Sequence, residues 1–251
     1  MRLNFVFNHP VGTLSIDYNH LMQSWFSDFL SKPDAKCYEG KLTAGCQEKR
    51  KFKLFTFSKL FFDSYKVRGY RISFNRGNAQ WFVSSPVKEF LNDFSAYMKN
   101  RKKISVNGVC FELMSIDEVQ MPPFGSEMKF TSLSPITVTT EGLDEMNSDG
   151  FFLKFEDMGF IQKIKDSLTD KYRKFTGMKI SNDNNFNFEF DSDYMERKRG
   201  RIQKKVKYER TEIVGYLAPF KVSAEPELLK FGYDTGFGDY CHMGFGMVKE
   251  I

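Results

Sequence analysis

The chain has 251 residues, of which 41% are hydrophobic and 27% are charged, and its formal net charge is +5. This length allows one large domain or two small ones. No apolar run approaches the roughly 18 residues of a membrane-spanning helix, and the amino terminus lacks a signal-peptide core. The four cysteines form no C-x-x-C motif and no zinc pattern with the three histidines. These features predict a cytoplasmic protein with free thiols, no metal site, no cofactor and no membrane partner.

The chain opens with a strand pattern followed by a helix pattern. In residues 2–7 every second side chain is large and apolar, which predicts a half-buried strand. Residues 18–30 predict a helix, because large apolar side chains recur at three- and four-residue spacing. Residues 31–47 are polar and irregular and predict a loop.

A β-rich stretch and a second helix pattern follow. Residues 52–62 predict a strand, and two further strand patterns at 70–74 and 80–83 flank Asn75-Arg76-Gly77-Asn78. This arrangement is typical of a hairpin. Residues 86–100 predict a helix that begins with a proline.

The last strand pattern of the first half covers residues 103–119, with Asn107-Gly108 as a tight turn. The order of elements is then β-α-β-β-α-β, the ferredoxin-like unit. Met121-Pro122-Pro123 reads as a linker, so we place a first domain at residues 1–121.

The second half repeats this order, which predicts a second ferredoxin-like domain at residues 126–251. Its expected elements are a strand at 130–139, a helix at 155–175, strands at 186–190 and 206–222, a short helix at 226–231 and a final strand. The predicted fold class is therefore α+β, with tandem ferredoxin-like (RRM-like) domains.

A glycine-rich stretch precedes the final strand and consists of two Gly-Phe-Gly tripeptides separated by five residues. Glycine lets backbone N–H groups approach an anion closely, and successive N–H groups can form a concave phosphate nest. The alternative is a pair of unrelated tight turns. The candidate phosphate contacts are Gly236, Gly238, His242, Gly244 and Gly246.

Positive charge is concentrated between residues 196 and 210, where eight basic residues face two acidic ones. Such a local field suits RNA, whose recognition relies on phosphate contacts, shape and stacked bases. The alternative is a solvated hairpin with its charges pointing outward. The basic residues are Arg197, Lys198, Arg199, Arg201, Lys204, Lys205, Lys207 and Arg210, and a smaller cluster contains Lys49, Arg50, Lys51 and Lys53.

The glycine-rich stretch resembles the carboxy-terminal loop of the RAMP RNA-binding proteins. In detail it is similar to the CRISPR repeat-RNA-processing endoribonuclease family, whose loop reads Gly-x-Gly, five residues, Gly-Phe-Gly. Three other stretches agree in order and spacing: Tyr18-Asn19-His20, Lys53-Leu54-Phe55-Thr56-Phe57-Ser58 and Leu133-Ser134-Pro135-Ile136. The resemblance covers essentially the whole chain. It implies tandem ferredoxin-like domains and CRISPR repeat RNA as a partner, and it leaves other CRISPR-associated proteins and a homodimer as candidate partners.

The resemblance implies metal-independent RNA cleavage, in which the ribose 2′-hydroxyl attacks phosphorus and leaves a 2′,3′-cyclic phosphate and a 5′-hydroxyl. This chemistry needs a base, an acid and a cation. Lys53 matches the family's catalytic lysine, but residues 31–52 contain no histidine, where many members have one. His20 is a candidate for either a structural or a catalytic role, and Tyr38 is a candidate assisting hydroxyl.

Two functions therefore remain open, and a third is less favoured. The first is an endoribonuclease that cleaves precursor CRISPR RNA within the repeat, in which the loop glycines, His242 and the basic residues contact RNA. The second is a catalytically inactive CRISPR RNA-binding subunit of a larger complex, which the missing histidine supports. The third is a general RNA-binding protein outside CRISPR. The carboxylates show no convergence of the kind that a divalent-metal nuclease needs.

Overall fold

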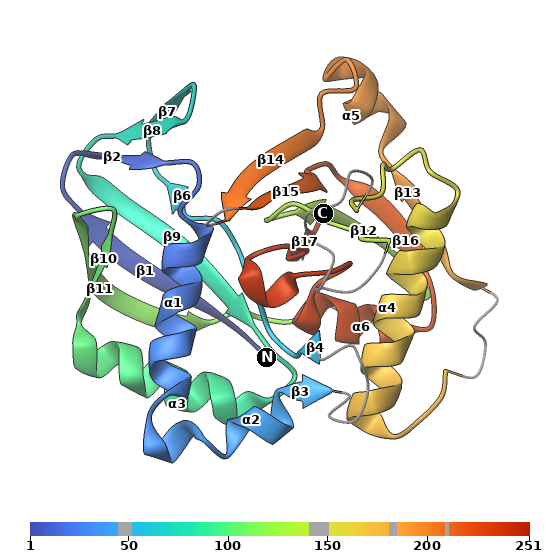
Figure 1. The fold of residues 1–251 in the computed structure, drawn as a ribbon, viewed down its shortest axis with the longest axis horizontal. Coiled ribbons are helices and arrows are strands. Elements are labelled where there is room, and N and C mark those ends of the chain that lie inside the picture. Colours follow the sequence, from blue (N-terminus) through green and yellow to red (C-terminus); the bar gives the residue numbers. More distant parts are fainter. Residues whose placement is uncertain (45–51, 141–150, 181–184, 209–210) are drawn as a thin grey trace.

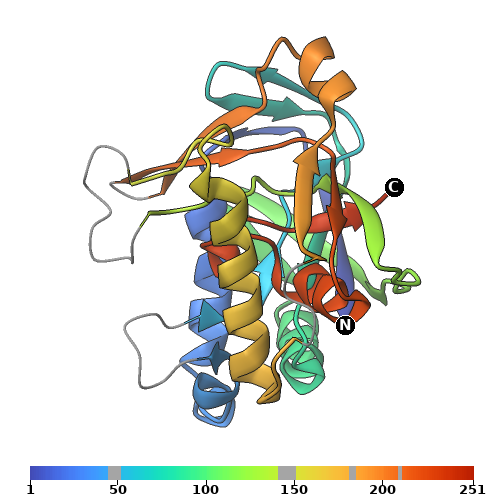
Figure 2. The same ribbon diagram turned by 90° about the vertical axis from the view of Figure 1, so that its right-hand side faces the viewer.

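A computed structural model describes residues 1–44, 52–140, 151–180, 185–208 and 211–251. Two halves lie side by side (Figure 1), and each has its own hydrophobic core. The α1 and α4 helices, one from each half, lie on the same side of the molecule (Figure 2). None of the described helices is long and apolar enough to cross a membrane.

The amino-terminal half is built on a six-stranded sheet, in the order β10-β11-β1-β9-β5 with β6 also paired to β9. Strands β11, β1, β9 and β5, with helices α1 and α3, form the predicted ferredoxin-like unit. Phe5, Phe7 and Trp81 point from the sheet into a core that the helices close. The bounds are β1 Arg2–His9, α1 Asn19–Leu30, β5 Thr56–Phe57, β6 Phe61–Phe62, β9 Gly77–Ser84, α3 Lys88–Arg101, β10 Lys103–Val106 and β11 Val109–Glu118.

The hairpin predicted around residues 75–78 is wrong. Strand β8 (Arg71–Phe74) pairs with β2 (Gly12–Ser15) and β7 (Tyr65–Arg68) in a separate three-stranded sheet. The ring of Phe74 stacks on that of Phe62 with centroids 4.4 Å apart, which stabilises this separate sheet. Strand periodicity identifies a strand but does not say which strand it pairs with.

The loop predicted over residues 31–47 contains regular structure in its described part. Tyr38 and Leu42 are buried in this segment and anchor short turns that are too brief to produce a helical period. Leu54, just beyond it, packs in the core of the other half, so this segment joins the two halves. The elements are η1 Pro33–Ala35, α2 Tyr38–Lys41, β3 Thr43–Ala44 and β4 Phe52–Lys53.

The carboxy-terminal half has a four-stranded sheet in the order β13-β16-β12-β17, with α4 and α6 packed in the same core. This is the same ferredoxin-like order, so the tandem fold is confirmed. A separate hairpin, β14–β15, carries much of the basic stretch, and α5 lies at the top of both views (Figures 1 and 2). The bounds are β12 Glu127–Ser132, α4 Gly159–Thr176, β13 Asn187–Phe190, α5 Ser192–Arg197, β14 Gln203–Tyr208, β15 Thr211–Tyr216, β16 Phe220–Ser223, α6 Pro226–Thr235, η4 Cys241–Met243 and β17 Val248–Glu250.

The strand predicted over residues 130–139 is shorter than expected. Strand β12 ends at Ser132, and beyond it Ile136, Thr137 and Thr139 form only isolated bridges. Pro135 has no N–H group to donate to a ladder, which is consistent with this interruption.

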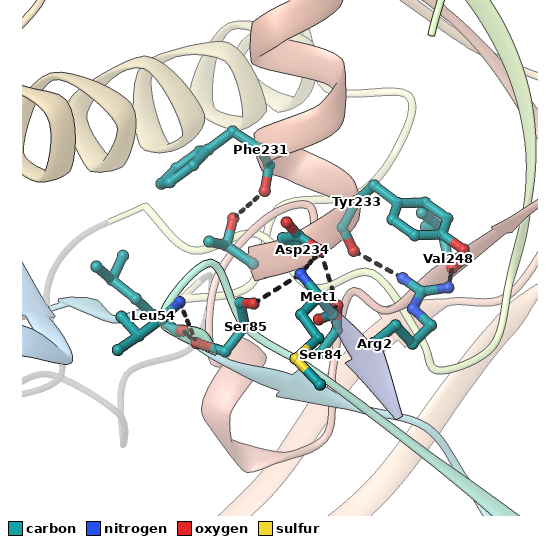
Figure 3. A network of polar contacts seen from close by, with 11 residues as sticks. Met1, Arg2, Leu54, Ser84, Ser85, Phe231, Tyr233, Asp234 and Val248 are labelled. Carbon is teal, nitrogen blue, oxygen red and sulfur yellow. Dashed lines mark hydrogen bonds and ion pairs between the residues drawn. The ribbon is translucent and has the colours of Figure 1, made fainter. Parts of the chain in front are cut away.

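A buried polar network joins the two halves (Figure 3). The guanidinium of Arg2, in β1, donates to the carbonyl oxygens of Val248 at 2.6 Å and Tyr233 at 2.7 Å, and lies over the Tyr233 ring. The hydroxyl of Ser84 donates to the Asp234 carboxylate at 3.2 Å. Burial lowers the pKa of Arg2 to about 10, which leaves it charged at neutral pH. Because a buried charge is costly without such partners, this network fixes how the halves meet.

Candidate active site and nucleic-acid interface

The glycine-rich stretch, residues 236–246, lies between the two halves and is pressed against both. All four of its glycines have positive φ. A Cβ added to Gly244 would lie 2.5 Å from the ring of Phe57 in the first half, and one added to Gly238 would collide with the Thr137 carbonyl in the second. Both positions therefore need glycine for conformation and for close approach.

Side chains from both halves hold this loop by its carbonyl oxygens. From α1, Asn19 donates its amide to Gly244 at 3.1 Å, and from β5 the Thr56 hydroxyl donates to Phe245 at 2.9 Å. From α4, the buried ammonium of Lys171 donates to Gly238 at 2.7 Å. The Tyr-Asn-His and Lys-Leu-Phe-Thr motifs of the sequence thus supply a structural support for the loop.

The backbone N–H groups of the loop are largely engaged inside the protein. Those of Phe237, Asp239, Gly244 and Gly246 each donate to a protein carbonyl. Of residues 236–246, only Asp239 and His242 are partly exposed. The structure thus gives the glycines a packing role, and their predicted contact with RNA phosphate stays a prediction.

His242 is the side chain of this loop that faces Phe55. It lies on η4, and its ring meets the edge of Phe55 with centroids 6.2 Å apart. Burial, together with the positive charges of Lys53 and Lys171, lowers the pKa of His242 to about 3. The imidazole is therefore neutral at physiological pH, and one of the two charges that act on it is that of Lys53, the lysine that matches the family's catalytic lysine.

Lys53 and Phe55 line an open cavity of about 620 Å³ between α1, α2 and the β3–β4 pair. Tyr38, Gln23 and Ser27 form part of the opposite lining. Lys53 and Tyr38, two of the candidate catalytic residues, thus line the same cavity as polar groups from α1.

The hydroxyl of Tyr38 is already committed to a neighbour. It donates to the Asp93 carboxylate at 2.5 Å, and the residue is buried. Burial and this hydrogen bond raise the pKa of Tyr38, so the phenol stays protonated. The predicted catalytic role of Tyr38 is not favoured by this geometry, whereas a structural role is.

His20 faces the basic hairpin. Its ring lies 6.2 Å from that of Tyr208 in β14, and its Nδ1 atom is buried without a hydrogen-bond partner. Tyr208 also donates to Gln23 of α1 at 3.0 Å, and the Lys207 N–H donates to Asp17 at 2.8 Å. The start of α1 thus anchors the hairpin, and His20 belongs to that contact.

The basic stretch forms α5, a tight turn and β14, and its charges point outward. Seven of its eight basic residues lie in the described part of the chain, and all are exposed. Lys205 pairs with Glu212 across the hairpin at 2.7 Å. The stretch is therefore a solvated hairpin that presents positive charge, and its contact with RNA stays a prediction. The described residues are Arg197, Lys198, Arg199, Arg201, Lys204, Lys205 and Lys207, whereas Lys49, Arg50, Lys51 and Arg210 lie outside the described residues.

One cation of this interface was missed in the sequence. Lys59, just after β5, is partly buried, and no carboxylate in the described chain pairs with it. Burial and the positive charge of Lys204 lower the pKa of Lys59 to about 8. Lys59 and Lys204 come from different halves of the molecule, and the charge of Lys204 acts on Lys59. A single lysine after a strand carries no sequence signal of this kind.

Within the described residues, no three histidine, cysteine or acidic side chains gather as a metal site.

The family model for CRISPR associated protein Cas6, C-terminal, matches residues 119–250 of this chain. The chain belongs to the Cas6 family. CRISPR-associated endoribonuclease Cas6 1 of Methanocaldococcus jannaschii is 32% identical over 202 residues, which are 80% of this chain and 75% of that protein. CRISPR-associated endoribonuclease Cas6 of Pyrococcus furiosus is 26% identical over 237 residues, 93% of this chain and 83% of that protein.

The solved structures agree with the fold described above. A Cas6-related protein of Pyrococcus furiosus superimposes with a TM-score of 0.82 at 20% identity, over 100% of this chain and 98% of that one. The resemblance inferred from the glycine-rich stretch is thereby confirmed. A role in CRISPR RNA processing follows from membership of the Cas6 family.

Proposed function

We propose that this chain binds CRISPR repeat RNA and cleaves it within the repeat by a metal-independent reaction. The ribose 2′-hydroxyl attacks the adjacent phosphorus, and the products carry a 2′,3′-cyclic phosphate and a 5′-hydroxyl. The observation that carries this proposal is the position of Lys53 in an open cavity, where the neighbouring Phe55 contacts His242 of the glycine-rich loop. Curated relatives named as CRISPR-associated endoribonucleases support it.

Lys53 suits the role of a charge stabiliser. As the 2′-oxygen adds, negative charge develops on the non-bridging oxygens of phosphorus. A fixed ammonium group in a partly enclosed site stabilises that charge more than water does. The lining of the cavity by α1 and α2 limits the water around Lys53 and so strengthens its field.

The RNA path proposed here follows the exposed cations. Arg199, Arg201 and Lys204 on the α5–β14 segment would bind RNA phosphates. The RNA strand would then continue past His20 and η4 to the cavity. Such contacts position RNA through its backbone and make affinity depend on salt. In this proposal, the residues that bind the repeat therefore lie apart from the residues that cleave it.

The proposal is tested by cleavage of the cognate repeat RNA with EDTA present, and of the same RNA with a 2′-deoxy substitution at the cut site. Cleavage that survives EDTA and stops with the deoxy RNA is the expected result. Lys53→Ala should slow cleavage by roughly 100-fold or more, since one electrostatic contact to the transition state has about that value. Its affinity for the deoxy RNA should change little.

The matched control is Lys103→Ala. Lys103 is an exposed lysine on the edge strand β10, where it pairs with Glu112. This variant should cleave and bind like the unsubstituted chain. Equal losses of cleavage and binding in Lys53→Ala would contradict a catalytic role for Lys53.

A second candidate function is a CRISPR RNA carrier that does not cleave. The absence of histidine from residues 31–52 favours it, as does a relative in Pyrococcus horikoshii named as an endoribonuclease-like protein, 25% identical over 170 residues. Tight binding of the repeat RNA without cleavage under any condition would support this carrier function instead.

A further inference from the structure

The tip of the glycine-rich loop presents one titratable side chain from a rigid support. Cys241 and Met243 flank His242 on η4, and both are buried. Asn19 holds the carbonyls of Met243 and Gly244, and Lys171 holds that of Gly238. The imidazole of His242 is thus positioned by contacts from both halves of the molecule.

The surroundings of this imidazole are cationic and apolar. Lys53 acts on it from β4 and Lys171 from α4, while Phe55 covers one edge of its ring. The contacts of Gly244 with α1 and β5 are to Asn19 and Phe57, which carry no charge. The carboxylate of Asp239 is held by Thr139 and Ser167.

The other two histidines are placed for other roles. The ring of His9 is buried among Phe62, Phe74 and Phe111 in the first core. His20 faces Tyr208 of the hairpin. Among the histidines, only His242 contacts Phe55, which lines the same cavity as Lys53, the proposed charge stabiliser.

We infer that His242 is the general base of the proposed cleavage reaction and replaces the histidine that residues 31–52 lack. This inference rests on the proposed function. The imidazole accepts the proton of the 2′-hydroxyl while the 2′-oxygen forms a bond to phosphorus. The bond from phosphorus to the 5′-oxygen breaks, and the 5′-oxygen keeps the electron pair and takes a proton from water. Lys53 neutralises the non-bridging oxygens.

The low pKa of His242 belongs to the RNA-free protein. An imidazole with a pKa of about 3 is available as a proton acceptor at neutral pH but is a weak base. A phosphodiester bound next to Lys53 brings a negative charge that offsets the two ammonium groups. We therefore expect RNA to raise the pKa of His242 toward its ordinary range and so to strengthen the base only when substrate is present.

The first test is single-turnover cleavage by His242→Ala and His242→Asn, with binding measured separately on 2′-deoxy RNA. General-base catalysis contributes roughly 10²–10⁴-fold, so both variants should cleave about 100-fold more slowly or worse, with affinity changed less than about threefold. Added imidazole should restore part of the rate in His242→Ala, which a merely structural role would not allow. Thermal unfolding checks that both variants fold.

The second test is an NMR titration of the histidine ring nitrogens, with and without the 2′-deoxy RNA. The His242 signal should titrate at higher pH in the complex than in the RNA-free protein. Rates of both variants within about threefold of the unsubstituted chain, or a His242 titration that RNA leaves unchanged, would overturn the inference while the proposed function stands. No cleavage by the unsubstituted chain would overturn both.

Discussion

The glycine-rich loop and the β14–β15 hairpin both serve the proposed RNA surface, but they are built in opposite ways. The loop is buried, and its backbone groups are held by side chains from both halves. The hairpin carries its cations in solvent, while Val206 and Ile213 on its inner face pack against the loop and Lys207 and Tyr208 bond to residues at the start of α1. The proposed catalytic residues therefore lie on a rigid, buried support. The residues proposed to give RNA affinity lie instead on an exposed surface, where substitutions should cost little stability.

The largest effect is expected at the loop. Gly244→Ala places a Cβ against Phe57, and Gly177→Ala at the end of α4 does not, although both glycines have positive φ. Gly177→Ala should cost about 1 kcal/mol of unfolding free energy from conformation alone. Gly244→Ala should cost roughly 3 kcal/mol or more, because a clash adds to it. Chemical denaturation measures both, and equal costs would show that the loop is not tightly packed.

The hairpin should respond in affinity rather than in stability. The triple substitution of Arg199, Arg201 and Lys204 to Gln removes three candidate phosphate contacts from exposed positions. Affinity for repeat RNA should fall by at least about tenfold at low salt, and the slope of log affinity against log salt should fall by about 2. Single-turnover cleavage at saturating RNA should be unchanged.

The matched control for this triple variant is Lys103→Gln on the far edge of the first sheet. It should leave both the affinity and its salt dependence as they are. A loss of cleavage at saturating RNA in the triple variant would show that binding and chemistry are not separated in space.

Substitution of Lys59 should have a smaller effect on RNA affinity, and this effect should depend on pH. Its pKa of about 8 means that the ammonium form is lost as the pH rises above this value. RNA affinity should therefore fall by a few fold between about pH 7 and pH 9, and this fall should vanish in Lys59→Gln. Filter binding at constant ionic strength measures it. The same pH dependence in both proteins would exclude Lys59 from the RNA path.

A further effect is expected in the acid stability of the fold around the loop. The folded-state pKa of His242 is lowered to about 3, below the unfolded value near 6.5. Below about pH 6.5 the unfolded chain therefore takes up a proton at this position before the folded chain does, which destabilises the fold. As the pH falls from 7.5 to 4.5, the unfolding free energy of His242→Gln should therefore rise relative to that of the unsubstituted chain. An identical stability difference at both pH values would mean that the imidazole is not desolvated.

Most of the element order was readable from the sequence because it depends on local patterns. The spacing of Trp25, Phe26 and Phe29 predicted α1, and the positions of Asn107 and Gly108 predicted a tight turn that the structure confirms with two positive φ angles. The unpredicted features are short or pairwise. The turns between residues 31 and 44 show no repeating period. The partner of β8 depends on a tertiary contact, the packing of the Phe74 ring on Phe62.

The sequence by itself determined the family, the tandem ferredoxin-like order, the glycine-rich loop and Lys53 as the lysine of interest. These are properties of neighbouring residues, which periodicity and motif spacing record. The tertiary structure was needed to show that Tyr38 donates to Asp93, that the charge of Lys204 acts on Lys59, and that His242 contacts Phe55 beside the cavity of Lys53. The hydrogen bond from Thr56 to Phe245, which helps to hold that loop, spans 189 positions. Such contacts arise when two separately folded cores meet, and no local pattern along the chain encodes them.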